Sequence, residues 1–346
     1  MRFLPLFALA TTLLGAVTVS AQTAPPMNPI PMHIAPAPLY RDPITDGPAD
    51  PLIIYNAPQK QWWMFYSQRR AQLELPNVSF CYGTDVGIAT SSDNGKTWVY
   101  KGAPNLAIEP GSNTFWAPEV LFDGTGYHMF VTYIQGVRSD WGGTSRTAHY
   151  TSTDLWNWKF QDFSNFDSPE VIDISIIQMP DKTWRVWYKD QQNGGSISTS
   201  TSPDLIHWKR DAKPAISGGA QEGPNVFRFQ NHYWMITDEW RGQRVFRSDD
   251  AINWEKQGLI LDVPGTRPQD TPQGAHADVE VTGGHAYIFY FTHPGRKSHF
   301  DAAMAANGVY PYDQRRSLVQ VADLRAENGT LTCDRNAPFD FYLPNN

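Results

Sequence analysis

Carboxylates recur at the start of five alternating, strand-like stretches of the sequence. Asp50 precedes PLIIY, Glu119 lies in WAPEV, Asp173 in VIDIS, Glu222 before GPNVF and Asp278 in GAHADV. Charged side chains are usually spread over the solvated surface, so their repetition at one point of a pattern indicates a site. Neighbouring carboxylates raise one another's pKa. A raised pKa can keep one carboxylic acid protonated beside an ionised partner, which is the pair of states that cleavage of a glycosidic bond requires.

Two of these positions have competitors nearby in the sequence. The segment RDPITDGPADP also offers Asp42 and Asp46, but only Asp50 stands directly against the strand PLIIY. In the third stretch, Asp173 is followed by Ile174, and Asp167 is the alternative acid. The sequence therefore favours Asp50 and Asp173 and leaves the choice between Asp50 and Asp46 open.

A repeat runs through the whole chain and predicts the elements that position these acids. Four stretches share Ser, then Asp, then Trp, namely TSSDNGKTW, TSTDLWNW, TSPDLIHW and RSDDAINW at residues 90–98, 151–158, 201–208 and 247–254. In such a turn the Asp can accept hydrogen bonds from turn amides while the Trp packs beneath. The tryptophans recur at intervals of 60, 50 and 46 residues. A period of this size is typical of a propeller or a solenoid.

Between these turns lie aromatic strands such as WWMFYSQ, YHMFVTY and WRVWYKD, each preceded by another alternating strand. No sustained helical period is present. Five units of about 50 residues with four strands each predict an all-β protein, a five-bladed β-propeller over residues 33–346. Two β-sandwiches in tandem would not explain one repeat through the whole chain. In a propeller the first strand of each blade lines the central channel, so we expect the five acids to meet at one mouth.

The motifs Asp50-Pro51, Trp116-Ala117-Pro118-Glu119, Ile172-Asp173 and Glu222-Gly223-Pro224, in this order on the repeat, resemble glycoside hydrolase family 43. The resemblance implies that Asp50 is the general base, that Glu222 is the general acid and that Asp173 raises the pKa of the acid and orients it. It implies inversion of configuration, for which base and acid carboxyls lie roughly 6.5–9.5 Å apart. His276 resembles the channel histidine of the family, which holds a water or a calcium ion; no cofactor is required.

The family's common activities imply a carbohydrate partner, with removal of a terminal arabinofuranose or xylose from plant or algal material as the default. The insertion at residues 67–87 is atypical for such enzymes, so a relative acting on anhydro-galactose, galactofuranose or an acidic sugar competes. Guanidinium groups recognise carboxylates and sulfates, which makes Arg69 and Arg296 candidates for an acidic sugar. Trp116 is a candidate stacking platform or a packing residue. The remaining expected substrate contacts are Glu119, His276 and Asp278.

Two other readings of a propeller remain. A sialidase, suggested by the Ser-Asp-Trp turns, would have six blades, a tyrosine nucleophile and a three-arginine clamp, and would leave the acids unexplained. A lectin-like propeller would bind sugar without cleaving it, and would not need Asp50 together with Glu222.

The bulk properties exclude several classes of partner. A net charge of −7 and a pI near 5.7 give no nucleic-acid footprint, and no apolar run after the N-terminus is long enough to span a membrane. Residues 1–21 have the form of a signal peptide cleaved after Ala21, and residues 22–32 form a Pro-rich lead-in, so we expect a secreted or periplasmic protein. Cys81 and Cys333 are the only cysteines. In an exported chain they could form one disulfide, or remain two buried thiols.

Overall fold

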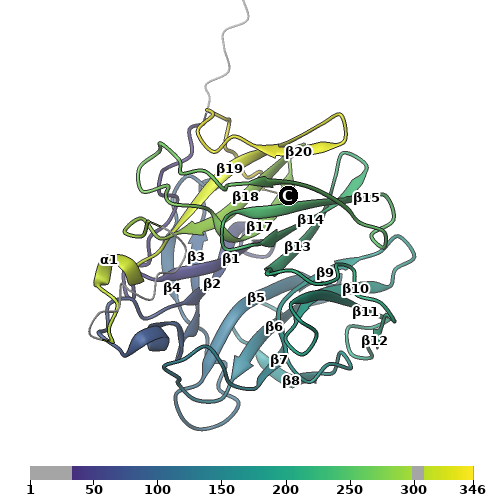
Figure 1. Ribbon diagram of the computed structural model, residues 1–346, viewed down its shortest axis with the longest axis horizontal. Helices are drawn as coiled ribbons and strands as arrows, with labels where there is room; N and C mark the ends of the chain where they lie inside the picture. Colours follow the sequence, from purple (N-terminus) through teal and green to yellow (C-terminus); the bar gives the residue numbers. More distant parts are fainter. Residues whose placement is uncertain (1–32, 298–307, 346) are drawn as a thin grey trace, which may run out of the picture. The chain divides into compact units, whose positions relative to one another are not determined.

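Five four-stranded antiparallel sheets make up the fold of the computed structural model, which describes residues 33–297 and 308–345. In Figure 1 the sheets follow one another in chain order, from purple β1 through teal β9 to yellow β19. The architecture is the predicted five-bladed β-propeller. The expected signal peptide and Pro-rich lead-in lie outside the described residues. Neither helical element of the described part is long and apolar enough to cross a membrane.

Each blade is a simple meander in which consecutive strands pair. The blades are β1 Pro48–Asn56, β2 Gln61–Gln68, β3 Asp85–Ser91 and β4 Val99–Gly102; β5 Thr114–Phe122, β6 Tyr127–Ile134, β7 Ser145–Ser152 and β8 Lys159–Ser164; β9 Val171–Gln178, β10 Trp184–Asp190, β11 Ser196–Ser202 and β12 Lys209–Arg210; β13 Glu222–Phe229, β14 His232–Asp238, β15 Gln243–Ser248 and β16 Glu255–Ile260; β17 Ala275–Thr282, β18 His285–Thr292, β19 Leu318–Glu327 and β20 Thr330–Cys333. A short 3-10 helix, η1 Asn77–Cys81, and one helical turn, α1 Tyr312–Arg315, lie in connections.

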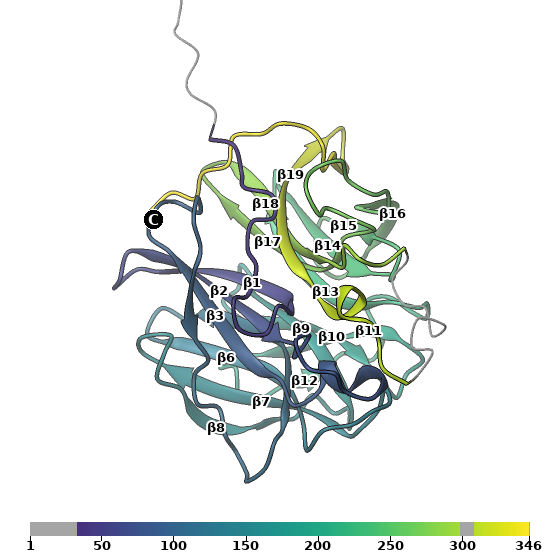
Figure 2. The same cartoon turned by 90° about the vertical axis from the view of Figure 1, so that its left-hand side faces the viewer.

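The first strands of the five blades contact one another in a closed ring, β1 to β5, β9, β13, β17 and back to β1. The core lies between neighbouring blades, where aromatic and aliphatic side chains from two sheets interdigitate. The chain ends close the ring. Tyr40 pairs with Val319 of the last blade, while Pro344 accepts a hydrogen bond from the indole of Trp62 in the first blade. Figure 2 shows the purple segment before β1 passing beside β19.

The repeated Ser-Asp-Trp turns have the structure that the sequence predicts. Asp154 accepts hydrogen bonds from the backbone N–H groups of Trp156 and Asn157 at 2.9 and 2.8 Å, and Asp250 does the same for Ile252 and Asn253. These turns join the third and fourth strands of a blade, so they lie at the end of the propeller opposite to the start of each first strand. They are structural and contribute nothing to the mouth of the channel.

The expected disulfide between Cys81 and Cys333 is absent, and both residues are free thiols. Cys81 ends η1 and packs in an apolar cluster with Val78, Phe80 and Tyr82. Cys333 ends the outermost strand of the fifth blade and packs against the separate core between blades four and five. Because the two residues belong to different apolar clusters, no bridge forms.

Candidate active site

The first strand of every blade carries a β-bulge at the same place, and the bulge residue faces the mouth of the channel. The register shifts fall at Asp50, Ala117, Asp173, Gly223 and His276. The first four have φ of 51°, 46°, 51° and 56°. For residues other than glycine this left-handed conformation is uncommon and costs free energy. Bulges of this kind turn a side chain out of the regular pleat, often beside an active site.

Asp50 is buried in a polar pocket of its own blade and its neighbours. Its Oδ2 accepts a hydrogen bond from Ser67 Oγ at 2.6 Å, and Arg69 Nη2 and His276 Nδ1 lie 3.4 and 3.5 Å from its Oδ1. The Arg69 guanidinium in turn stacks over Phe291, 4.9 Å from the ring centroid. Arg69 and His276, both expected in the site from sequence, therefore meet at Asp50.

The competing acids of the first blade are engaged elsewhere. Asp46 forms an ion pair with Arg41 at 2.6 Å and accepts a short hydrogen bond from Tyr312. Asp42 accepts hydrogen bonds from the backbone N–H groups of Ile44 and Thr45 and from the Tyr66 hydroxyl. Both carboxylates stabilise the segment that leads into β1, and Asp50 alone of the three contacts the channel histidine.

Asp173 occupies the bulge of the third blade and is buried. Its Oδ2 accepts the backbone N–H of Gly223 at 3.2 Å, which joins it to the fourth blade. Burial raises the pKa of Asp173 to about 6, and the charges of Glu222 and Asp50 add to this, while His276 and Lys189 oppose it. Asp167, the alternative acid, is exposed in the loop before β9. The structure therefore brings Asp173, and not Asp167, to the mouth.

Glu222 is held between two side chains that the sequence did not single out. Lys189 Nζ lies 3.0 Å from Glu222 Oε2, and the Trp240 indole N–H donates to Oε1 at 2.9 Å. Burial opposes ionisation of Glu222, but Lys189 and the Trp240 hydrogen bond outweigh it and lower the pKa. In the free protein the carboxylate expected to be the acid is therefore ionised, and the raised pKa belongs to Asp173.

Trp240 lies in the β14–β15 loop and has φ of 58°, a strained conformation for a bulky residue. Its backbone N–H donates to Asp238 Oδ1 at 2.6 Å, and its ring stands 5.1 Å from Lys189 Nζ. Asp238 pairs across the strands with Glu222 and accepts the backbone N–H of His276 at 2.8 Å. Burial raises the pKa of Asp238 to about 7, helped by the charge of Glu222.

The sequence does contain a signal for Lys189 and Asp238. In a meander the second strand of each blade ends at the mouth where the first strand begins. The last residues of β10 and β14 are therefore neighbours of the acids, and Lys189 and Asp238 stand there.

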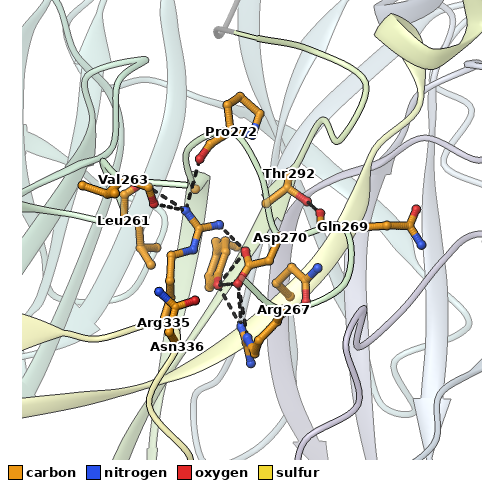
Figure 3. Close-up of polar contacts among 12 residues, drawn as sticks. Leu261, Val263, Arg267, Gln269, Asp270, Pro272, Thr292, Arg335 and Asn336 are labelled. Atoms are coloured by element: carbon orange, nitrogen blue, oxygen red, sulfur yellow. Dashed lines mark hydrogen bonds and ion pairs between the residues drawn. The ribbon is translucent and has the colours of Figure 1, made fainter. Parts of the chain in front are cut away.

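The loop before β17 is fixed by a buried ion network, drawn in Figure 3. Asp270 is fully buried, with Arg335 in direct contact and Arg267 Nη2 at 3.0 Å. Arg335 also donates to the carbonyl of Val263 at 2.9 Å. The same loop supplies Gln273, whose amide donates to the Trp240 carbonyl at 3.2 Å. The C-terminal segment thus supports the loop that holds Trp240 and leads to His276.

Glu119 and Asp278 join blades together. Glu119 Oε1 accepts the backbone N–H of Ile176 in the next blade at 2.7 Å, and Asp278 Oδ2 accepts that of Ile53 at 2.9 Å. Both lie two residues beyond the bulge, deeper in the channel, and burial raises the pKa of both, to about 6 for Asp278. This position differs from the expected one at the mouth and gives both carboxyls a structural role.

The channel between these acids narrows to a cavity of about 20 Å³, lined among others by Asp50, Glu119, His276 and Asp278. That volume is enough for about one water molecule. A calcium ion takes six to eight oxygen ligands, and residues 33–297 and 308–345 contain no group of three or more acidic, His or Cys side chains arranged to hold a metal ion. The surroundings of His276 therefore suit a water better than calcium.

Trp116 and Arg296, the other two expected substrate contacts, lie in different parts of the structure. Trp116 lies at the mouth, directly before the bulge of the second blade, and its indole N–H donates to the Cys81 carbonyl at 2.6 Å. Arg296 is buried, and its Nε donates to the Gln314 carbonyl at 2.5 Å. Burial lowers the pKa of Arg296 to about 9. Arg296 therefore holds α1 in place, whereas Trp116 shares the mouth with the carboxylates.

Comparisons with known proteins agree with this fold. Residues 41–262 match the family model described as "Probable glycosyl hydrolase domain", which is related to family 43. A thermostable family-43 glycoside hydrolase superposes with a TM-score of 0.62 at 18% identity, over 88% of this chain and 98% of that one. No curated protein matches the sequence.

Two further structures are similar in fold at low identity. The exo-β-1,3-galactanase from Phanerochaete chrysosporium with galactose gives a TM-score of 0.60 at 16% identity, over 83% of this chain and 62% of that one. The xylan β-1,4-xylosidase from Bacillus halodurans C-125 gives 0.62 at 15% identity, over 86% and 57%. The family match covers well over half of the chain, so the chain belongs to the glycosyl hydrolases related to family 43 and is a glycoside hydrolase.

Proposed function

We propose that the protein is a secreted, inverting and exo-acting glycosidase that removes a terminal sugar from plant or algal oligosaccharide. The observation that carries this proposal is the pair Asp50 and Glu222, held at one channel mouth in different surroundings. Asp50 is buried and accepts hydrogen bonds from Ser67 and Arg69, the setting of a carboxylate that orients a water. Glu222 has a side chain 26% exposed, so it can meet an incoming glycosidic oxygen.

The proton for the leaving group is available next to Glu222. Burial raises the pKa of Asp173 to about 6 and that of Asp238 to about 7, so both keep a proton to higher pH than Glu222, whose pKa is lowered. A sugar that enters beside Glu222 displaces water from its carboxylate and separates the carboxylate from Lys189. Both changes disfavour the Glu222 carboxylate, which then accepts a proton and delivers it to the leaving oxygen. Asp50 removes a proton from the attacking water on the other face of the sugar.

Relatives that share this fold support the proposed substrate class. Solved neighbours include β-xylosidases and enzymes acting on β-1,3-linked galactose, and the default for this chain is a terminal xylose or arabinofuranose, with galactose as the first competitor. Arg69 and Lys189 are already paired with Asp50 and Glu222, which disfavours an acidic sugar. Export rests on residues 1–21, and sequencing of the secreted protein is expected to begin at Gln22.

The deciding experiment compares Asp50→Asn and Glu222→Gln on xylosides, arabinofuranosides and galactosides with poor and good leaving groups. We expect both variants to lose at least about a thousandfold in kcat/KM on natural oligosaccharides. On dinitrophenyl glycosides, which need no proton, Glu222→Gln recovers activity and Asp50→Asn does not. Asp46→Asn is the matched control and retains activity. NMR of the first product shows the inverted anomer.

Two results overturn the proposal. If Asp50→Asn and Glu222→Gln keep wild-type turnover, the catalytic assignment is wrong. If the wild-type protein binds these sugars and hydrolyses none of them, the propeller is a lectin.

A further inference from the structure

Trp141 is displayed to solvent at the mouth of the propeller. All thirteen tryptophans lie in the described residues, and among them Trp141 is the one that is mostly exposed, at 56%. Exposing a large indole is unfavourable unless a partner covers it in use. Nothing in the proposed catalytic step uses this residue.

Topology places Trp141 on the catalytic face. Strand β5 starts at the mouth, β6 returns to it, and residues 135–144 connect β6 to β7 on that same face. Phe122, at the other end of β5, is also exposed, at 52%, but lies on the opposite face. The two aromatic side chains therefore differ in the face that they occupy.

The loop that carries Trp141 is firmly held. Tyr82 Oη donates to the Gly142 carbonyl at 3.0 Å and accepts the Gly142 backbone N–H at 2.9 Å. Arg138 forms two hydrogen bonds with Asp140 at 2.9 and 3.0 Å across the same loop. Tyr82 belongs to the atypical insertion at residues 67–87, so this insertion acts as a support for the indole.

Trp141 is connected to the catalytic carboxylates through Trp116. Its ring packs edge-on against Trp116, with centroids 6.2 Å apart, and Tyr82 packs edge-on against Trp116 at 4.8 Å. The residue after Trp116 is Ala117, whose N–H donates to Ser67 Oγ, the hydroxyl that donates to Asp50. Trp116 and Glu222 occupy equivalent positions directly before the bulges of blades two and four.

We propose that Trp141, supported by Trp116 and Tyr82, forms a second sugar-binding subsite that stacks on the C–H face of the ring next to the one cleaved. The carboxylate-lined centre takes the terminal ring, and the indole beside it takes the neighbouring ring. The inference rests on the proposed glycosidase function and deepens it. With this subsite the protein binds a disaccharide or longer chain in preference to a monosaccharide.

The test measures binding, so that it does not depend on turnover. In the Asp50→Asn background, titration calorimetry compares xylobiose with xylose, arabinobiose with arabinose, and β-1,3-galactobiose with galactose. We expect at least one disaccharide to bind about tenfold more tightly than its monosaccharide, the size expected for one aromatic contact. Trp141→Ala removes this advantage, Trp141→Tyr keeps most of it, and Phe122→Ala, the exposed aromatic on the opposite face, leaves it unchanged.

A disaccharide advantage that survives Trp141→Ala overturns the subsite, as does the lack of any disaccharide advantage in the parent protein. These outcomes are distinct from failure of the proposed function. A propeller that shows the Trp141-dependent advantage but hydrolyses no sugar has the subsite without the reaction.

Discussion

Lys189 Nζ lies 3.0 Å from Glu222 Oε2, so the expected general acid is ion-paired in the free protein. Asp173, Asp238, His276 and Arg69 also interact with this carboxylate through their charges. Lys189 and the Trp240 indole N–H contact Glu222 directly, and both favour its ionised form.

Replacing Lys189 by Met is expected to move the alkaline limb of the pH dependence of kcat/KM to higher pH. Lys189 lowers the pKa of Glu222, so its removal raises that pKa, and the acid stays protonated to higher pH. An opposite charge at this distance shifts a carboxyl pKa by about 1–3 units, and about one unit is expected for this partly exposed pair. Lys159→Met, at an exposed position on β8, is the control. A limb that stays in place or moves to lower pH contradicts the role given to Lys189.

The buried Asp270 is expected to be more important for stability than an ordinary surface acid. Asp270→Ala leaves Arg335, which is 4% exposed, without its charge partner in the interior. Loss of one member of a buried pair costs about 3 kcal/mol or more in the free energy of unfolding. Asp313→Ala removes a comparable ion pair with Arg316 on the surface and is expected to cost below about 1 kcal/mol. Urea unfolding of both variants measures the difference; equal losses would show that the Figure 3 network is not a stabilising element.

Cys81 and Cys333 are expected to be detected as free thiols by a thiol reagent. Burial raises the pKa of Cys81, and raises that of Cys333 to about 12, so neither forms the reactive thiolate readily in the folded protein. A thiol reagent is expected to modify neither residue quickly in the native state and both in denaturant without a reductant. Thiols that appear only after reduction would reveal a disulfide.

The fold could be predicted from sequence because its signals are local. Each Ser-Asp-Trp turn uses hydrogen bonds that span three or four residues, such as those of Asp154 with Trp156 and Asn157. Alternation along each strand records burial on the two faces of a sheet. Five repeats of this pattern left one simple arrangement that buries every blade, the closed propeller.

The site could be predicted in part. Asp50 and Asp173 stand at bulges, and Gly or Pro next to an acid marks where a strand begins. The surroundings of Glu222 could not be predicted, because Lys189 lies 33 residues before it and Trp240 18 residues after it. The five acids also looked equivalent in the pattern. A shift of two residues along the strand places Glu119 and Asp278 deeper, where they bond to backbone amides of the next blade.

By itself the sequence determined the number of blades, the course of each strand and the carboxylates that reach the channel, since these depend on periodicity and on turn chemistry within a few residues. Only the tertiary structure decided which carboxyls have a raised pKa and which cation contacts Glu222. It also decided that Cys81 and Cys333 stay apart and that Trp141 stands beside the mouth. These properties depend on burial and on distances between side chains from different blades and loops, and such distances are created only when the ring of blades closes.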